Sequence, residues 1–329
     1  MSAPILRVEG LRTYFPIRRG VFQRIAGHVR AVDGVDLAVP AGGTLALVGE
    51  SGCGKTTVGR SILRLVEPQA GSVWYEGTDL LRLTPAELRP YRRHLQVVFQ
   101  DPIAALDPRM RVRDSIAEGM VAFRIGAGDA ERTDRVAALM RRVGLDADQM
   151  RRYPHEFSGG QRQRICIARA LAVEPRLIVC DEAISALDVS IQAQILNLLR
   201  DLQQDLGLSY LFITHDLSVV RYLADRVAVM YLGQIVEERE TEALFAAPAH
   251  PYTRGLLASV PSVDPATPGA RARVRGDVPS PARPPEGCRF HTRCPEVFAR
   301  CSVEAPPLYG VDGGASRCFL VDPEHASVR

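Results

Sequence analysis

The stretch GESGCGKTT, residues 49–57, has the composition of a loop that binds phosphate groups. It matches the pattern G-x-x-x-x-G-K-[ST], whose glycines let the backbone wrap closely around phosphate oxygens. The apolar run 44–48 precedes it and the helix-like run 57–66 follows, which is the strand–loop–helix setting that the pattern requires. We therefore predict that Lys55 reaches the β- and γ-phosphates of a nucleotide and that Thr56 supplies an oxygen to Mg²⁺, in preference to a glycine-rich turn without a ligand. The residues predicted to bind nucleotide in this loop are Gly49, Glu50, Ser51, Gly52, Cys53, Gly54, Lys55, Thr56 and Thr57.

A pair of carboxylates follows a second apolar run, in LIVCDE at residues 177–182. A carboxylate at the end of a buried strand can face phosphates across a sheet, so Asp181 is the predicted partner of Mg²⁺. Glu182 is the predicted base that polarises an attacking water. Adjacent acids can also be solvated turn residues, but their occurrence together with the phosphate loop favours a phosphoryl-transfer site.

Apolar strand-like runs alternate with helix-like runs over the middle of the chain. The strand-like runs are 44–49, 176–182 and 209–216, and the helix-like runs are 161–173 and 190–207. This alternation favours a mostly parallel α/β sheet, and Gly207 is placed to end the last helix. The basic, poorly periodic residues 16–30 are expected to form a loop, and the Pro- and Gly-rich residues after Pro248 a tail with little regular structure.

Composition narrows the class of protein. The 329 residues are 46% hydrophobic and 24% charged, with a net charge of +3 that is too small to argue for a nucleic-acid partner. No apolar run approaches the roughly 18–20 residues that span a bilayer, and the start MSAPILRVEG lacks a signal pattern. We therefore expect a soluble or peripheral protein.

With these motifs the sequence resembles the ATP-binding subunits of ABC transporters, and FSGGQRQR at residues 157–164 is the decisive stretch. Phe157 stands where the family more commonly has leucine. Ser158, Gly159 and Gly160, followed by Gln161, open a helix whose N-terminus is suited to an anion. In the family this end closes on the γ-phosphate held by a second subunit. The resemblance implies an ABC ATPase cassette, with a P-loop RecA-like core, an antiparallel β subdomain and a helical signature subdomain.

The resemblance also implies roles for residues outside these three motifs. Gln100 in VVFQDP corresponds to the glutamine that reaches Mg²⁺ and the attacking water, and His215 to the switch histidine at the γ-phosphate. Phe15 aligns with the aromatic residue that stacks on adenine, with Tyr14 as the alternative. The SALD sequence, with Ser185 and Asp188, corresponds to a loop that crosses between the two subunits.

Four further segments resemble the oligopeptide and dipeptide importer ATPases, and within them the F-type subunit. These segments are residues 14–35, 100–110, 250–261 and 276–295. The resemblance implies that ATP hydrolysis powers di- or oligopeptide import, with nickel or glutathione import, or a non-transport ABC ATPase, as alternatives. Its implied partners are a D-type ATPase or a second copy, two permease subunits and a separate binding protein, with no nucleic acid, at the cytoplasmic face of the inner membrane.

The domain boundaries follow from the same segments. We expect the cassette over residues 1–247, with the helical subdomain at about 101–170. The importer-type extension is expected over residues 248–329.

The extension collects four of the seven cysteines. Cys288, Cys294, Cys301 and Cys318 have the spacing C-x₅-C-x₆-C-x₁₆-C, without the paired C-x₂-C of many zinc sites. Four thiolates can hold a [4Fe–4S] cluster, and the subfamily resemblance makes this the expected cofactor beside ATP and Mg²⁺. Zinc and unliganded cysteines are the alternatives.

Overall fold

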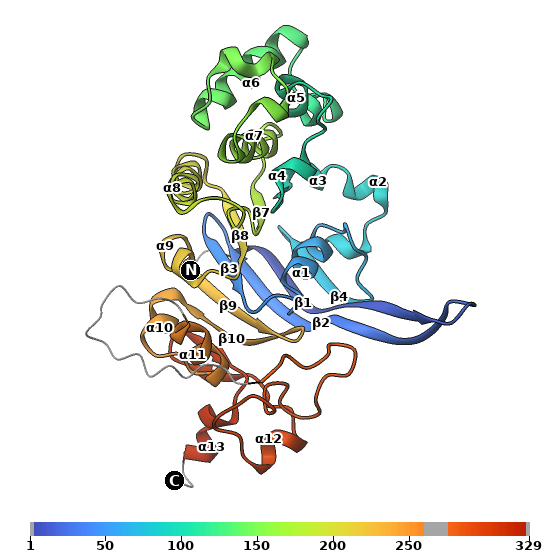
Figure 1. Cartoon of the computed structure of the whole chain (residues 1–329), viewed down its shortest axis with the longest axis vertical. Helices are drawn as coiled ribbons and strands as arrows, with labels where there is room; N and C mark the ends of the chain where they lie inside the picture. The colour runs from blue at the N-terminus through green and yellow to red at the C-terminus, as the bar shows by residue number, and fades with distance from the viewer. Residues whose placement is uncertain (1–2, 260–275, 327–329) are drawn as a thin grey trace. The chain divides into compact units, whose positions relative to one another are not determined.

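The computed structural model describes residues 3–259 and 276–326 (Figure 1). The chain forms two compact units, each assembled from segments that are far apart in the sequence. Among the described residues, the first consists of 3–5, 39–43 and 82–213, and the second of 6–38, 44–81, 214–259 and 276–326. Each unit therefore positions its own share of the predicted motifs.

A four-stranded antiparallel sheet in the order β2-β1-β4-β5 lies mainly in the second unit. Its strands are β1 (Pro4–Arg19), β2 (Arg24–Pro40), β4 (Ala70–Tyr75) and β5 (Thr78–Asp79). Leu6 pairs with Tyr75 and Val8 with Val73, and these four side chains are buried. This is the antiparallel β subdomain that the resemblance implied.

The expected loop at residues 16–30 was wrong, because this stretch forms the long end of the β1–β2 hairpin (blue in Figure 1). Gln23 donates its N–H to the oxygen of Gly20 over 3.1 Å, and both residues have a positive φ that closes the turn. Residues 18–26 are all exposed, on both faces of the hairpin. Without one buried face the strands show no apolar alternation, which is why the pattern was missed.

The second unit also contains strands in the order β11-β12-β10-β9-β3. Their bounds are β3 (Thr44–Val48), β9 (Arg226–Tyr231), β10 (Gln234–Glu240), β11 (Tyr309–Val311) and β12 (Gly314–Ser316). Strands β3 and β9 are parallel, and both are almost fully buried. Helices α1 (Lys55–Ile62), α9 (Leu217–Leu223) and α10 (Thr241–Ala246) belong to the same unit.

The first unit holds three parallel strands in the order β8-β7-β6 together with most of the helices. Its strands are β6 (Leu95–Val98), β7 (Leu177–Asp181) and β8 (Ser209–Thr214). Its helices are α2 (Pro85–Leu88), α3 (Tyr91–His94), α4 (Pro102–Ala105), α5 (Val112–Ala122), α6 (Asp129–Arg142), α7 (Gly159–Leu171) and α8 (Val189–Leu206). Gly207, at φ 65°, ends α8 as predicted.

The C-terminal extension is more regular than expected. It contains α11 (Pro251–Ala258), α12 (Ala299–Val303) and α13 (Pro323–Ala326) besides β11 and β12, while residues 260–275 lie outside the described part. His250 caps α11 by accepting the N–H of Tyr252 at Nδ1 over 3.0 Å. Such short elements depend on tertiary packing, which a sequence pattern does not reveal.

No helix in the described ranges combines the length and the apolar character needed to cross a membrane.

Candidate nucleotide-binding site

The phosphate loop lies between the buried strand β3 and helix α1, as the sequence predicted. Lys55 is 4% exposed, and its Nζ donates to the carbonyl oxygens of Gly49 over 2.7 Å and Glu50 over 3.1 Å. The ammonium group is thus held inside the curve of the loop. This is the position from which a lysine can reach phosphates bound by the loop amides.

Two glycines of the loop are required by its backbone. Gly49 and Gly54 have φ of 152° and 110°, and a Cβ on either would fall 2.2 Å from the oxygen of Met230 or 2.0 Å from that of Ala31. Both contacts are with backbone oxygens, which could make room for a side chain only if the main chain of the neighbouring strands moved. The G-x-x-x-x-G spacing is therefore enforced by close packing of the loop on β9 and β2.

In the first unit, the predicted magnesium and water ligands follow the ends of neighbouring parallel strands. Val98 of β6 pairs with Cys180 of β7, so Gln100 and Asp181 emerge from the same edge. Asp181 is 5% exposed, and Glu182 has a φ of 50°, which is rare for a residue with a side chain. Unusual backbone of this kind concentrates at functional sites.

Glu182 is held in this conformation by main-chain contacts. Its N–H donates to the oxygen of Ile213 over 3.0 Å, and its own carbonyl oxygen accepts the hydroxyl and the N–H of Ser185. Ser185 therefore braces the residue that we predict to activate water.

The predicted signature motif begins helix α7. Ser158 accepts the N–H of Gln161 over 3.3 Å, and the side chain of Gln161 accepts the N–H of Ser158 over 3.0 Å, which completes a capping box. A Cβ on Gly160 would meet Cγ2 of Ile191 at 2.5 Å. Ser158 and Gly159 are exposed, so this helix end can meet an anion from outside the unit.

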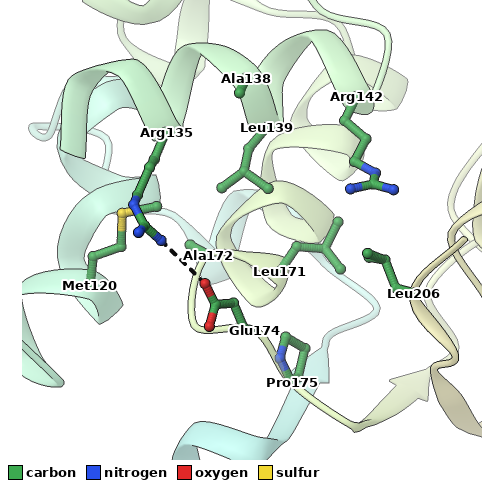
Figure 2. Close-up of a pocket in the computed structure, with 10 residues that line it drawn as sticks. All are labelled: Met120, Arg135, Ala138, Leu139, Arg142, Leu171, Ala172, Glu174, Pro175 and Leu206. Carbon is green, nitrogen blue, oxygen red and sulfur yellow. Dashed lines mark hydrogen bonds and ion pairs between the residues drawn. The ribbon is translucent and has the colours of Figure 1, made fainter. Parts of the chain in front are cut away.

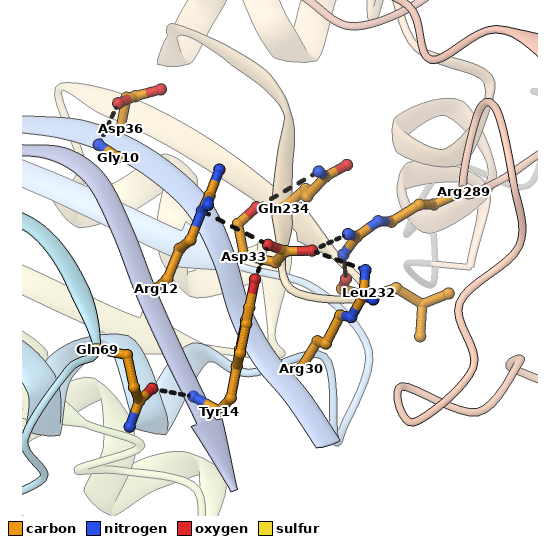
Figure 3. Close-up of polar contacts among 10 residues, drawn as sticks. All are labelled: Gly10, Arg12, Tyr14, Arg30, Asp33, Asp36, Gln69, Leu232, Gln234 and Arg289. Atoms are coloured by element: carbon orange, nitrogen blue, oxygen red, sulfur yellow. Dashed lines mark hydrogen bonds and ion pairs between the residues drawn. The ribbon is translucent and has the colours of Figure 1, made fainter. Parts of the chain in front are cut away.

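The two aromatic residues predicted to stack on adenine have different surroundings. Tyr14 donates its hydroxyl to Asp33, which also pairs with Arg289 (Figure 3). Phe15, the next residue along β1, is 40% exposed and is the better candidate for stacking on a base. Burial by itself raises the pKa of Asp33, but the hydrogen bonds from Tyr14 and Arg289 outweigh it and hold that pKa below its usual value.

His215 follows β8 and is exposed, immediately before Asp216, which caps α9. The second unit thus carries the phosphate loop, Phe15 and His215. The first carries Gln100, Asp181, Glu182 and the signature helix.

Sequence reasoning missed a contact between the C-terminal extension and the phosphate loop. Arg293 donates to the Glu50 carboxylate from both terminal nitrogens, over 2.7 and 3.0 Å. Tyr252 accepts the N–H of Glu50 at its hydroxyl over 2.8 Å. No short-range pattern could have found these pairs, because 243 and 202 positions separate their members.

The four cysteines of the extension converge. Cys288, Cys294, Cys301 and Cys318 line one cavity of about 10 Å³, and no disulfide joins them. Burial raises the pKa of Cys294 to about 11 and that of Cys318 to about 12, and the neighbouring thiols add to both shifts. Within residues 3–259 and 276–326, no three His, Cys, Asp or Glu side chains are placed to hold a metal ion, so the expected ligation is not confirmed.

A larger cavity, of about 520 Å³, lies among the helices of the first unit (Figure 2). Arg135 and Glu174 form an ion pair over 3.2 Å at its wall. None of the residues predicted to bind nucleotide lines it.

A phosphate loop, a capped SGGQ helix and an acidic strand end, in this order along one chain, define an ATPase of the ATP-binding cassette class. Family comparison agrees: residues 32–185 match the ABC transporter family and residues 236–301 match "Oligopeptide/dipeptide transporter, C-terminal region". The chain belongs to the ATP-binding proteins of peptide ABC transporters.

Curated relatives resemble the chain along nearly its whole length. A probable peptide ABC transporter ATP-binding protein, y4tS of Sinorhizobium fredii, is 50% identical over 99% of this chain and 93% of its own. The oligopeptide transport ATP-binding protein AppF of Bacillus subtilis is 50% identical over 92% of both chains. The dipeptide transport ATP-binding protein DppF of Haemophilus influenzae is 45% identical over 98% of both chains.

A solved structure shares the cassette fold. The ATP-binding cassette MJ0796, solved as a dimer in a post-hydrolysis state with ADP and Pi, aligns with a TM-score of 0.64 and 26% identity. It covers 72% of this chain and 98% of its own. The predicted ABC ATPase fold is therefore confirmed for the cassette.

Proposed function

We propose that this chain is the ATP-hydrolysing motor subunit of a transporter that imports di- or oligopeptides. The observation that carries the proposal is an intact phosphate loop, with Lys55 held in its curve, in a chain that also has the acidic strand end and the signature helix. The peptide cargo is supported by the importer-type C-terminal region and by the names of the relatives.

Each motif has a separate task in this proposal. The loop amides and Lys55 bind the β- and γ-phosphates, while Thr56, Gln100 and Asp181 hold Mg²⁺. When bound, Mg²⁺ neutralises charge on the phosphate oxygens. Phe15 stacks on the adenine.

Hydrolysis needs a positioned water and stabilisation of charge on the transferred group. Glu182 orients and polarises the water, and His215 contacts the γ-phosphate. The N-terminus of α7, from Ser158 to Gln161, approaches the γ-phosphate held by a second ATPase chain, with the SALD loop crossing beside it. Because the γ-phosphate is then held between two chains, ATP binding closes a pair of cassettes, and hydrolysis with release of the products opens it.

The hydrolytic role is tested by Glu182→Gln, which keeps the size of the side chain and removes its basicity. We expect ATP binding to be retained and turnover in the assembled complex to fall by at least ~10²-fold. Glu174→Gln is a matched control, because Glu174 also has a positive φ but pairs with Arg93 and Arg135 away from every nucleotide motif. Near-normal turnover of Glu182→Gln would refute the assignment.

The proposed complex contains a D-type ATPase subunit or a second copy of this chain, two permease subunits and an extracytoplasmic binding protein. The chain itself binds peripherally at the cytoplasmic face of the inner membrane. Uptake of labelled di- and oligopeptides in cells lacking this chain tests the cargo. If peptide uptake is intact and nickel or glutathione uptake is lost, the cargo is nickel or glutathione. If the chain co-purifies with ribosomes or DNA, it is a non-transport ABC ATPase.

We further propose that the four cysteines of the extension bind an iron–sulfur cluster. Their chemistry supports this, and so does their position, because all four line the same cavity. The cavity is about the size of one water, so the thiols must move apart to accept a four-iron cluster. Iron with a broad visible absorbance after anaerobic purification is the expected result, and zinc alone, or no metal, refutes it.

A further inference from the structure

The segment from Cys288 to Cys294 directs two arginines at the cassette. Arg289 donates to Asp33 and to the oxygen of Leu232 (Figure 3). Arg293, four residues further on, donates to Glu50 in the phosphate loop. The extension therefore contacts both the strand pair that carries Phe15 and the loop that carries Lys55.

The pair Arg293–Glu50 has the geometry of a strong contact. Both terminal nitrogens of the guanidinium meet both carboxylate oxygens, which fixes orientation as well as distance. The Arg293 side chain is 6% exposed, lies over the ring of Tyr231 at 5.8 Å and donates from Nε to the oxygen of Gly276 over 3.1 Å. The Arg293 guanidinium is thus shielded from water, while the Glu50 side chain is 26% exposed.

The backbone beneath Arg293 is also anchored. Phe290 is 1% exposed and packs against Tyr231 and Tyr252, each at 5.3 Å between ring centroids. Tyr252 accepts the N–H of Glu50 at the same time. The side chain and the main chain of Glu50 are thus both held by residues that follow the nucleotide motifs in the sequence.

The charge of Glu50 gives this contact a consequence beyond packing. A carboxylate on a loop that must accept the phosphates of ATP repels them unless a cation neutralises it. Arg293 supplies that cation. With Glu50 neutralised, the loop amides and Lys55 can attract the phosphates without a nearby negative charge that counteracts them.

We propose that Arg293 is a positioning residue of the ATPase, which neutralises Glu50 and holds the phosphate loop in the shape that binds nucleotide. This inference rests on the proposed nucleotide-binding function of the loop. It assigns the importer-type extension a part in the ATP site of its own chain.

The test measures the affinity of the purified full-length chain for a fluorescent ATP analogue with Mg²⁺. Arg293→Ala is expected to weaken binding roughly tenfold, since a charged hydrogen-bonded pair is lost and the carboxylate is left uncompensated. Arg293→Lys, which keeps the charge but loses the paired contact, is expected to lie between this variant and the wild type. The double variant Glu50→Gln with Arg293→Ala is expected to recover much of the loss, because it removes the uncompensated charge.

Two controls separate this inference from simpler explanations. Arg254→Ala breaks another ion pair, to Glu296 within the extension over 2.6 Å, without reaching the phosphate loop, and should leave affinity unchanged. Lys55→Ala tests the loop itself. If Lys55→Ala leaves binding intact, the proposed function fails.

If binding depends on Lys55, three results would each overturn the inference. They are unchanged affinity of Arg293→Ala, an equal loss in Arg254→Ala, and no recovery in the double variant. Arg293→Lys covers the case in which Arg293→Ala folds poorly, because it keeps the positive charge and most of the buried side chain.

Discussion

Replacing Phe290 by alanine tests whether the C-terminal extension is part of the folded core of the second unit. Phe290 belongs to the same buried cluster as Val227, Val229 and Leu244, and three aromatic rings surround it, of which His250 lies 5.6 Å away. Removing a buried phenylalanine costs about 3–5 kcal/mol from the lost burial and the cavity left behind. The free energy of unfolding of a domain is only about 5–15 kcal/mol, so Phe290→Ala should remove a large part of it.

Urea unfolding provides the assay. Trp74 is the single tryptophan and lies in β4 of the same unit, where its Nε1 donates to Ser72 over 2.9 Å. With a slope of roughly 3 kcal/mol per molar urea, Phe290→Ala should lower the midpoint of the Trp74 fluorescence transition by about 1–1.7 M. Phe22→Ala deletes the same group at a residue that is 84% exposed and should shift the midpoint little.

The reasoning is refuted if the Trp74 midpoint of Phe290→Ala stays within about 0.3 M of the wild type, which corresponds to roughly 1 kcal/mol at that slope. An early loss of far-UV circular dichroism with an unchanged Trp74 transition would show that the extension detaches without unfolding its unit.

Further predictions concern the loop, a buried contact and acid stability. Gly54→Ala should abolish binding of the ATP analogue and lower the melting temperature more than Gly52→Ala, because a Cβ meets backbone at position 54 and open space at position 52. Tyr252→Phe leaves the N–H of Glu50 without its acceptor and should lower the free energy of unfolding by about 1–3 kcal/mol; a loss under about 0.3 kcal/mol would contradict this. The depressed pKa of Asp33 contributes stability above its unfolded value near pH 4, which is lost as the pH falls through the folded pKa. The free energy of unfolding of Asp33→Asn should therefore fall less between about pH 5 and pH 2 than that of the wild type. An equal fall in both proteins would contradict this prediction.

Features that depend only on neighbouring residues in the sequence could be predicted. The buried strand β3, the glycines of the phosphate loop and the glycine that ends α8 each follow from neighbouring residues, and the structure contains all three. The signature helix was predictable for the same reason, since its capping box spans only Ser158 to Gln161.

Features that depend on distant partners were not predictable. The exposed end of the β1–β2 hairpin has no buried face, so nothing in its composition marked it as strand. The α11 helix depends on packing of Tyr252 in the core, and the contact of Arg293 with Glu50 joins opposite ends of the chain. The cysteines were found by counting, but only the structure brings them to one cavity.

The short strands β11 and β12 also change what the second unit presents to other proteins. Glu237, Glu238 and Arg239 of β10 pair with residues of β12, which in turn pairs with β11. Without this pairing the seven-residue strand β10 would end the sheet, with a row of main-chain groups open to strands of other chains. With it, the outermost strand is three residues long and offers little to join. The extension therefore leaves only a short strand at this edge of the sheet, where few main-chain groups are available to pair with another chain.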